Sequence, residues 1–279
     1  MVLGWFRTTR RIKKPSKIPF GFAQCHPRCV RKECLPETVL KKVAKSLKLA
    51  NSSLPTIAKH LGVDPFNKGS LVDAFPFSKE EKDKIKKMWL RPPLPKEWKD
   101  NPEVWLDSNN IRDVMKQYEE GRKDFKFLGP HPIDFAAKDP YNDDKDRCLI
   151  GEMCTLDLDG MEGIKYVGIV YNLDPHYKDG SHWVANFIDI PNKACYYFDS
   201  YGMDPPKQIE KFMQWLTIQE PNIHLGINGK RFQRTTSECG TFCLYFIDRM
   251  LAGESFLHFI RRAPPDSFML EIRKMMYSS

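Results

Sequence analysis

The segment Arg234-Thr-Thr-Ser-Glu-Cys239-Gly240-Thr-Phe-Cys-Leu-Tyr-Phe-Ile-Asp248 is the most informative part of this 279-residue chain. Its apolar side chains recur at helical spacing behind Ser237 and Glu238, a cap and a first-turn residue, so a helix is predicted to begin at Cys239. A thiol there lies near unpaired N–H groups and the positive end of the helix dipole, which favours the reactive thiolate. Gly240 is expected to keep the space beside the sulfur clear for a substrate carbonyl.

The base that such a cysteine needs is assigned to His182. The alternating run 182–190 predicts a strand, and after a turn at 191–193 the run 194–202 predicts a second one. If the two strands pair as antiparallel neighbours, the carboxylate of Asp199 lies beside the imidazole. It would accept the far N–H of the ring, which fixes the tautomer and raises the basicity of His182.

Two further residues near Cys239 are given different roles. Gln233 lies six residues before the cysteine, at the end of a predicted strand. Its side-chain amide is expected to donate to the oxyanion that forms during attack, a contribution of roughly 3 kcal/mol in comparable sites. Cys243 follows Cys239 by one helical turn on the apolar side of the helix, so it is interpreted as a core residue.

The order His182-Trp183, Asp199-Ser200, Gln233, Glu238-Cys239-Gly240 resembles that of the adenain/SUMO-protease superfamily of cysteine proteases. Those enzymes process ubiquitin-like modifiers, adenovirus precursors and the core polyproteins of large DNA viruses. The segment 104–115, which contains Trp105, is similar to the loop and helix that open their catalytic domain. The resemblance covers roughly residues 100–279 and points in particular to the polyprotein proteases of African-swine-fever-like and giant viruses.

The substrate prediction depends on two tryptophans. Trp183 directly follows the proposed base, so its ring is expected to roof the cleft near the sulfur. The resemblance implies that Trp105 lies opposite, and two facing indoles would leave a slot that glycine passes and larger residues do not. We therefore expect cleavage after Gly-Gly in viral structural polyproteins during virion maturation. A simple core-anchor role stays open for either ring.

Gly-Gly ends ubiquitin-like tails as well as polyprotein junctions, so two other functions stay open. One is a deSUMOylase-like or deubiquitinase-like isopeptidase that removes a small protein modifier. The other belongs to a different class: a non-catalytic, nucleic-acid-binding packaging protein built on an inactive protease scaffold. The intact set of His182, Asp199, Gln233 and Cys239 argues against this last possibility.

Charge is unevenly distributed along the chain. Residues 1–100 hold 23 Lys and Arg against 9 Asp and Glu, whereas the whole chain holds 44 against 36. The densest part is a basic arm that includes Arg10, Arg11, Lys13 and Lys14. It could hold DNA, another polyanion or anionic lipid, or act as a nuclear-import cluster, or it could be a solvated tail.

The eight cysteines are expected to be reduced thiols, because the N-terminus does not have the pattern of a secretory signal. Cys25, Cys29 and Cys34 lack the second half of a zinc site, so no metal or other cofactor is predicted. No apolar run is long enough for a transmembrane helix. These features, with the viral resemblance, predict a protein of the host cytoplasm, at virus assembly sites, and of the virion.

The predicted organisation has two domains. Helices are expected at 35–49, 54–61 and 79–90, and the proline-rich segment 91–95 then marks a boundary near residue 95. Residues 1–95 form a basic helical module whose first 20 or so residues are an arm. Residues 96–279 are expected to adopt an α+β fold, a mixed or antiparallel central sheet flanked by helices, with a strand–turn–strand unit around Asn228-Gly229.

Overall fold

The computed structural model describes residues 25–29, 34–99, 101, 104–139 and 148–278. The chain forms two units. Among described residues, the sheet unit comprises Trp105–Met115 and Lys123–Met269. The helical unit comprises the described parts of Lys17–Val104, Lys116–Arg122 and Leu270–Ser279. This division differs from a single boundary near residue 95, because the chain end returns to the helical unit, where Ser278 forms backbone hydrogen bonds with Pro92 and Leu94.

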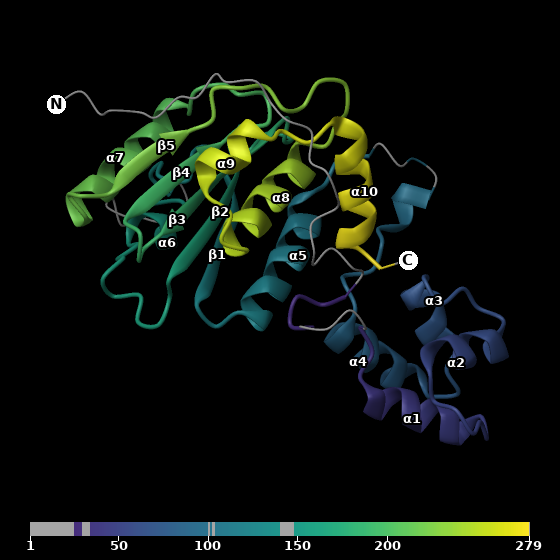
Figure 1. Ribbon diagram of the computed structural model, residues 1–279. Helices are drawn as coiled ribbons and strands as arrows, with labels where there is room; N and C mark the ends of the chain where they lie inside the picture. The colour runs from purple at the N-terminus through teal and green to yellow at the C-terminus, as the bar shows by residue number, and fades with distance from the viewer. Residues whose placement is uncertain (1–24, 30–33, 100, 102–103, 140–147, 279) are drawn as a thin grey trace. The chain divides into compact units, whose positions relative to one another are not determined.

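The sheet unit is built on a mixed five-stranded sheet with the strand order β1-β2-β3-β4-β5 (Figure 1). The central strands pair antiparallel: β2 (Tyr166–Asn172), β3 (Trp183–Asp189) and β4 (Ala194–Phe198). The outer strands β1 (Phe125–Pro132) and β5 (His224–Ile227) run parallel to their neighbours. Ala185 pairs with Phe198, so the start of β3 lies beside the end of β4. The predicted α+β fold is confirmed.

Helices cover both faces of this sheet. The apolar stripe of α7 (Lys207–Gln219), together with α6 (Gly151–Cys154), joins one core cluster with alternate residues of the central strands. On the other face, α8 (Cys239–Leu251) lies with α9 (Phe256–Arg261), as Figure 1 shows. There Phe198 of β4 stacks on Phe246 of α8 with ring centroids 5.0 Å apart. The middle of α8 therefore packs directly on the sheet.

The helical unit contains α1 (Glu37–Ser46), α2 (Leu54–Leu61), α3 (Lys68–Asp73), α4 (Lys79–Trp89) and a 3₁₀ turn, Lys96–Lys99. The three helices predicted in this region are present as α1, α2 and α4. The sequence did not predict α3, which spans only six residues. Two helices contribute residues to both units: α5 (Ser108–Gly121) and α10 (Asp266–Met276).

The predicted strand–turn–strand unit around Asn228-Gly229 is wrong. A strand precedes it, but none follows, and residues 228–237 form an irregular segment. The reason is the Asn228 side chain, which is fully buried and bonded to the backbone of Asp199 instead of forming a hairpin turn. Gln233 therefore lies in this segment and not at the end of a strand.

The expectation of eight reduced cysteines is also wrong. Disulfides join Cys25 to Cys34 and Cys148 to Cys154, because the fold brings their Cα atoms to 4.8 and 6.4 Å. Four described cysteines keep free thiols: Cys29, Cys195, Cys239 and Cys243. Within the described ranges, no group of three or more His, Cys, Asp or Glu side chains could hold a metal ion.

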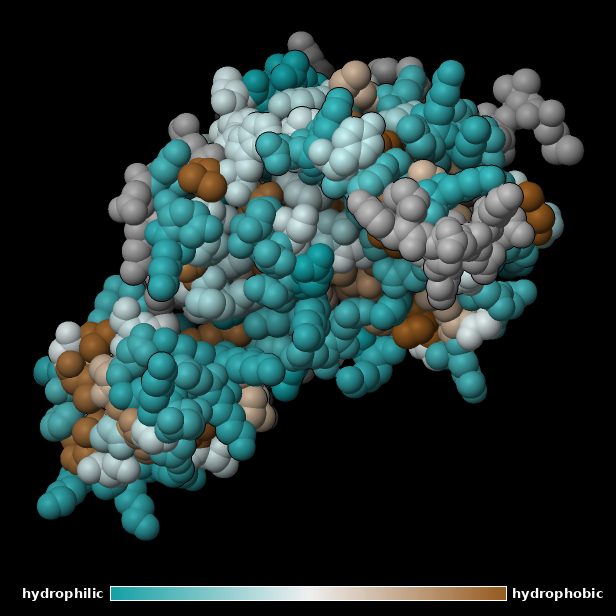
Figure 2. Space-filling view, turned by 180° about the vertical axis from the view of Figure 1, so that it is seen from behind, coloured by the Kyte–Doolittle hydropathy of each residue, from teal (hydrophilic) through white to brown (hydrophobic). Residues whose placement is uncertain are grey.

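Figure 2 shows hydrophilic side chains over most of one face of the sheet unit, with single apolar residues between them. Scattered apolar residues of this kind are ordinary on a protein surface. In the part of the chain that the structure describes, no helix is long and apolar enough to cross a membrane. The basic arm with Arg10, Arg11, Lys13 and Lys14 lies outside the described residues, so its predicted polyanion binding stays a prediction.

Candidate active site

The helix that carries the candidate nucleophile begins where the sequence predicts. Cys239 is the first residue of α8 and only 3% exposed. The cap differs from the prediction, because Glu238 holds the N-cap position and its side chain makes no capping hydrogen bond. The Glu238 carboxylate instead accepts a hydrogen bond from Thr241 Oγ1 at 2.5 Å. Cys239 therefore lies at the helix end where the first N–H groups have no partner within the helix.

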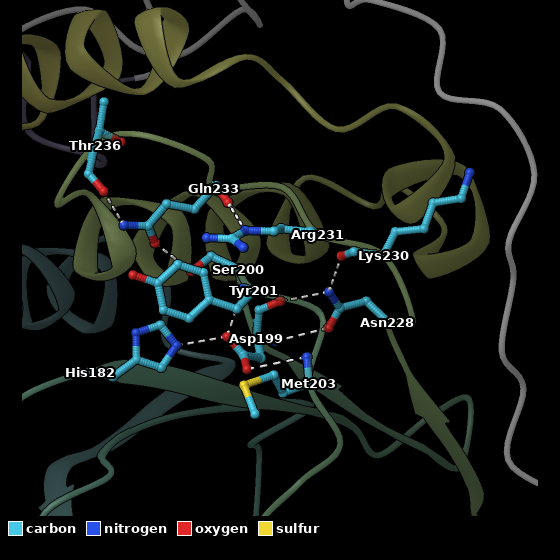
Figure 3. Close-up of polar contacts among 10 residues, drawn as sticks. All are labelled: His182, Asp199, Ser200, Tyr201, Met203, Asn228, Lys230, Arg231, Gln233 and Thr236. Atoms are coloured by element: carbon cyan, nitrogen blue, oxygen red, sulfur yellow. Dashed lines mark hydrogen bonds and ion pairs between the residues drawn. The ribbon is translucent and has the colours of Figure 1, made fainter.

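The proposed base and its carboxylate lie together as predicted. His182 immediately precedes β3, Asp199 immediately follows β4, and His182 Nε2 lies 2.7 Å from Asp199 Oδ1 (Figure 3). The side chains are 9% and 1% exposed. A carboxylate accepts but does not donate, so this contact fixes the proton on Nε2 and leaves Nδ1 for the thiol.

The pKa of His182 reflects competing effects. Burial lowers it, but hydrogen bonds to Asp199 and to the Cys239 side chain, with the attraction of both groups, raise it to about 9. A charged imidazolium is therefore favoured when the thiol gives up its proton. His182 thus has hydrogen bonds to both Cys239 and Asp199, so the structure brings these three residues into one site.

Asp199 is held by groups that the sequence analysis did not identify. Its Oδ1 also accepts from the backbone N–H of Tyr201 at 2.8 Å, and its Oδ2 from that of Met203 at 3.3 Å. The buried Asn228 amide bridges the Asp199 backbone, accepting from its N–H at 2.9 Å and donating to its carbonyl at 2.6 Å. The Asn-Gly pair was the available signal, but it was interpreted as a turn.

Gln233 lies in the same cluster, 1% exposed. Its Oε1 accepts from Ser200 Oγ at 2.7 Å, and its Nε2 donates to the carbonyl of Thr236 (Figure 3). An amide nitrogen carries two hydrogens, so one donor remains after the Thr236 bond. The residue is fixed in orientation, and its predicted oxyanion role stays a prediction.

The two tryptophans differ. Trp183 is 5% exposed, and its Nε1–H donates to the carbonyl of Leu106 at 2.8 Å. Trp105 is 46% exposed. A Cβ at position 240 would lie 3.0 Å from Leu106 and 3.3 Å from Trp183. The absence of a side chain at Gly240 therefore lets Leu106 and Trp183 pack against the start of α8. This corrects the expectation that Gly240 keeps space clear for the substrate. The slot between the two indoles stays a prediction.

A pocket of about 250 Å³ opens beside the Trp183 indole. It is formed by the ends of β1 and β2 and by the loop that leads into β3. The other cysteine of the segment takes no part in the site: Cys243 is fully buried, and burial raises the pKa of its thiol, so its assignment to the core is confirmed.

The segment that holds the candidate site is similar to a known protease family. The model of the Ulp1 protease family, C-terminal catalytic domain, matches residues 164–279, which include all four proposed catalytic residues. This segment is similar to the catalytic domain of the Ulp1 proteases, and the likeness covers less than half of the chain. The resemblance inferred from the sequence is thereby confirmed, over a shorter range than roughly 100–279.

Curated proteins that resemble the chain include viral proteases. The chain is 36% identical over 159 residues to "Putative thiol protease R355" of Acanthamoeba polyphaga mimivirus, which covers 54% of this chain and 49% of that protein. It is 33% identical over 117 residues to "SUMO-1 cysteine protease S273R" of African swine fever virus, covering 39% and 43%. The chain thus matches about half the length of these relatives.

The fold likeness extends further than the sequence likeness. The crystal structure of the African swine fever virus pS273R protease matches with a TM-score of 0.68 at 22% identity, covering 95% of this chain and 99% of that one. This match shows a shared fold, including the mixed sheet and its flanking helices.

Proposed function

We propose that this protein is a cysteine endopeptidase that cleaves after Gly-Gly in viral structural polyproteins during virion maturation. The observation that carries the proposal is the placement of a thiol at the start of α8 within hydrogen-bonding reach of a buried histidine–carboxylate pair. This arrangement suits nucleophilic catalysis because the histidine takes the thiol proton and the carboxylate stabilises the resulting imidazolium.

The mechanism follows from the positions of these groups. The Cys239 thiolate attacks the carbonyl carbon of the scissile bond, and the negative charge moves to the carbonyl oxygen. The remaining N–H of Gln233 and the N–H groups at the start of α8 are suited to stabilise that oxygen. The His182 imidazolium then protonates the leaving amine, which leaves a thioester. Water, deprotonated by the neutral imidazole, hydrolyses the thioester and restores the thiol.

Preference for glycine is supported by the small exposure of Cys239 and by the anchored Trp183. Because Cys239 is only 3% exposed, a glycine residue of the substrate can reach the sulfur more readily than a residue with a bulky side chain. The viral origin of the relatives supports a polyprotein substrate at assembly sites in the host cytoplasm or in the virion. Recruitment to DNA through the basic arm is a further part of the proposal.

A second candidate is an isopeptidase acting on a ubiquitin-like modifier, favoured by the name of the African swine fever virus relative, a SUMO-1 cysteine protease. To separate the two, the full chain is incubated with internally quenched Gly-Gly-X peptides, with matched Gly-Ala-X and Ala-Gly-X peptides, and with SUMO and ubiquitin precursors. The Cys239→Ala variant is the control.

We expect cleavage of Gly-Gly-X peptides alone, and none by Cys239→Ala. Efficient cleavage of Gly-Ala-X would refute the Gly-Gly slot. Processing of an intact modifier at rates far above those for peptides would establish the second candidate. If neither peptide nor precursor is cleaved under reducing conditions while Cys239 remains alkylatable, the proteolytic assignment fails.

A further inference from the structure

The phenol ring of Tyr201 lies flat against the imidazole of His182. Their centroids are 4.4 Å apart and their planes 7° apart (Figure 3). The backbone N–H of Tyr201 donates to the same Asp199 Oδ1 that accepts from His182 Nε2. One residue thus contacts the histidine through its ring and the carboxylate through its main chain.

Arg231 holds the phenol from its other side. Its guanidinium carbon lies 4.8 Å from the centroid of the Tyr201 ring, and Figure 3 shows the phenol between the imidazole and the guanidinium. The Nε–H of Arg231 also donates to the carbonyl of Gln233 at 2.7 Å. Because Arg231 is tied to the backbone, the phenol is confined between two partners, and a planar cation over a tyrosine face is an attractive contact.

The burial pattern indicates what this stack does. Tyr201 is 36% exposed, whereas the His182 side chain beneath it is 9% exposed. The phenol is therefore the layer between one face of the imidazole and solvent. Hydrogen bonds at the ring edge leave an imidazole some freedom to rotate about its side-chain torsions, whereas a parallel stack at this distance restricts that rotation.

We propose that Tyr201, held by Arg231, is a positioning residue that keeps the His182 imidazole oriented between Asp199 and Cys239. The proposal rests on the proposed cysteine-peptidase function but names residues outside its four catalytic side chains. It also links the two supporting groups of the site, because the same Arg231 fixes the backbone of Gln233.

The test measures alkylation of Cys239 by iodoacetamide from pH 5 to 10 in the full chain, with kcat and KM on a cleaved peptide measured in parallel. The variants are Tyr201→Leu, which removes the ring, and Tyr201→Phe, which keeps the stack and removes the hydroxyl. Tyr196→Leu is the matched control, because Tyr196 stacks on Phe256 with the same 4.4 Å separation and 7° angle away from the site.

Tyr201→Leu should slow alkylation at pH 8 and lower kcat by about 3- to 10-fold, the range expected for loss of one aromatic stack, with KM little changed. It should also move the alkaline limb of the alkylation profile to lower pH. The groups that act on the His182 ring are Asp199, Cys239 and, beyond the phenol, Arg231. An imidazole that leaves Asp199 part of the time loses the partner that raises its pKa.

Mere exposure of the ring would act in the opposite direction, because burial lowers the pKa of His182. A shift of the alkaline limb to lower pH therefore indicates that the ring has lost its orientation, and not merely that it has become more exposed to solvent. Tyr201→Phe should keep the unaltered profile. Arg231→Lys, which keeps the positive charge and removes the planar guanidinium over the phenol, should show a smaller shift in the same direction as Tyr201→Leu.

An upward shift, an unchanged profile in both Tyr201→Leu and Arg231→Lys, or equal effects of the Leu and Phe substitutions at position 201 would overturn the proposal. A shift of the alkaline limb in Tyr196→Leu as large as that in Tyr201→Leu would also overturn it. A His182→Ala variant separates this failure from that of the proposed function. If it keeps the alkaline limb, His182 does not activate the thiol at all, whereas loss of the limb with no effect of Tyr201→Leu refutes only the positioning role.

Discussion

The charge of Asp199 can be removed while most of its geometry is kept. In Asp199→Asn, the amide oxygen can still accept from His182 Nε2 and from the Tyr201 N–H, which lie 2.7 and 2.8 Å from Oδ1. What disappears is the negative charge that, with Cys239, raises the pKa of His182 against the opposing effect of burial, together with the 3.3 Å hydrogen bond from the Met203 N–H to Oδ2. The fold should survive this substitution, so its effect reports on electrostatics.

The magnitude follows from the pKa of His182, about 9 against an ordinary 6.5. Without the carboxylate charge, and with Cys239 alone left to oppose the effect of burial, that pKa should fall toward the ordinary 6.5. The imidazolium is present below the pKa and is lost as pH rises through it. At pH 8 its fraction then drops from about 0.9 to about 0.03, a loss of about 30-fold that corresponds to roughly 2 kcal/mol.

The assay is kcat/KM for a cleaved peptide, together with the rate of Cys239 alkylation, between pH 5 and 10. Asp199→Asn should move the alkaline limb from near pH 9 to near pH 6.5, and its activity should be closest to that of the unaltered chain at low pH. Asp189→Asn is the matched control, because Asp189 ends β3 and its carboxylate accepts from the backbone N–H and the side-chain amide of Asn192. An alkaline limb that stays near pH 9 in Asp199→Asn would refute this account of the site.

Three further outcomes are expected. In the folded, unmodified chain, iodoacetamide should label Cys239 well before Cys195, whose thiol is fully buried and has a pKa raised by that burial; equal labelling would contradict the nucleophile assignment. Gln233→Ala should lower kcat by about 100-fold with little change in KM, and a raised KM at normal kcat would assign it to substrate binding. Gly202→Ala should lower the free energy of unfolding by about 2–4 kcal/mol in chemical denaturation, because φ of Gly202 is +72° and a Cβ would lie 2.4 Å from the Lys230 backbone. A decrease below about 0.5 kcal/mol would show that the loop can move aside.

Much of this site could be predicted because its key signals are local. A run of apolar residues at helical spacing locates α8 and places Cys239 at its start. Two alternating runs joined by a three-residue turn predict neighbouring antiparallel strands, and that pairing alone brings His182 to Asp199. Each inference needs only the spacing at which apolar residues recur along the sequence and the length of a turn.

The failures involve residues whose partners are distant in sequence. Asn228 was assigned to a hairpin because Asn-Gly favours one, yet its buried amide binds the backbone of Asp199, and tertiary bonding overrode the local preference. The disulfides could not be foreseen, since no local pattern decides whether Cys25 meets Cys34. Strand β1 was missed because Gly129-Pro130 interrupts its pattern and its register.

Several of the contacts that the sequence did not predict lie between two loops, the one after β4 and the one after β5. Three successive residues after β4 are each held by the segment that follows β5: Asp199 by Asn228, Ser200 by Gln233 and Tyr201 by Arg231. The carboxylate that orients the base and the amide proposed for the oxyanion are therefore fixed by one loop-to-loop interface. A change in either loop should disturb both groups together, so double substitutions across this interface should be less than additive in kcat.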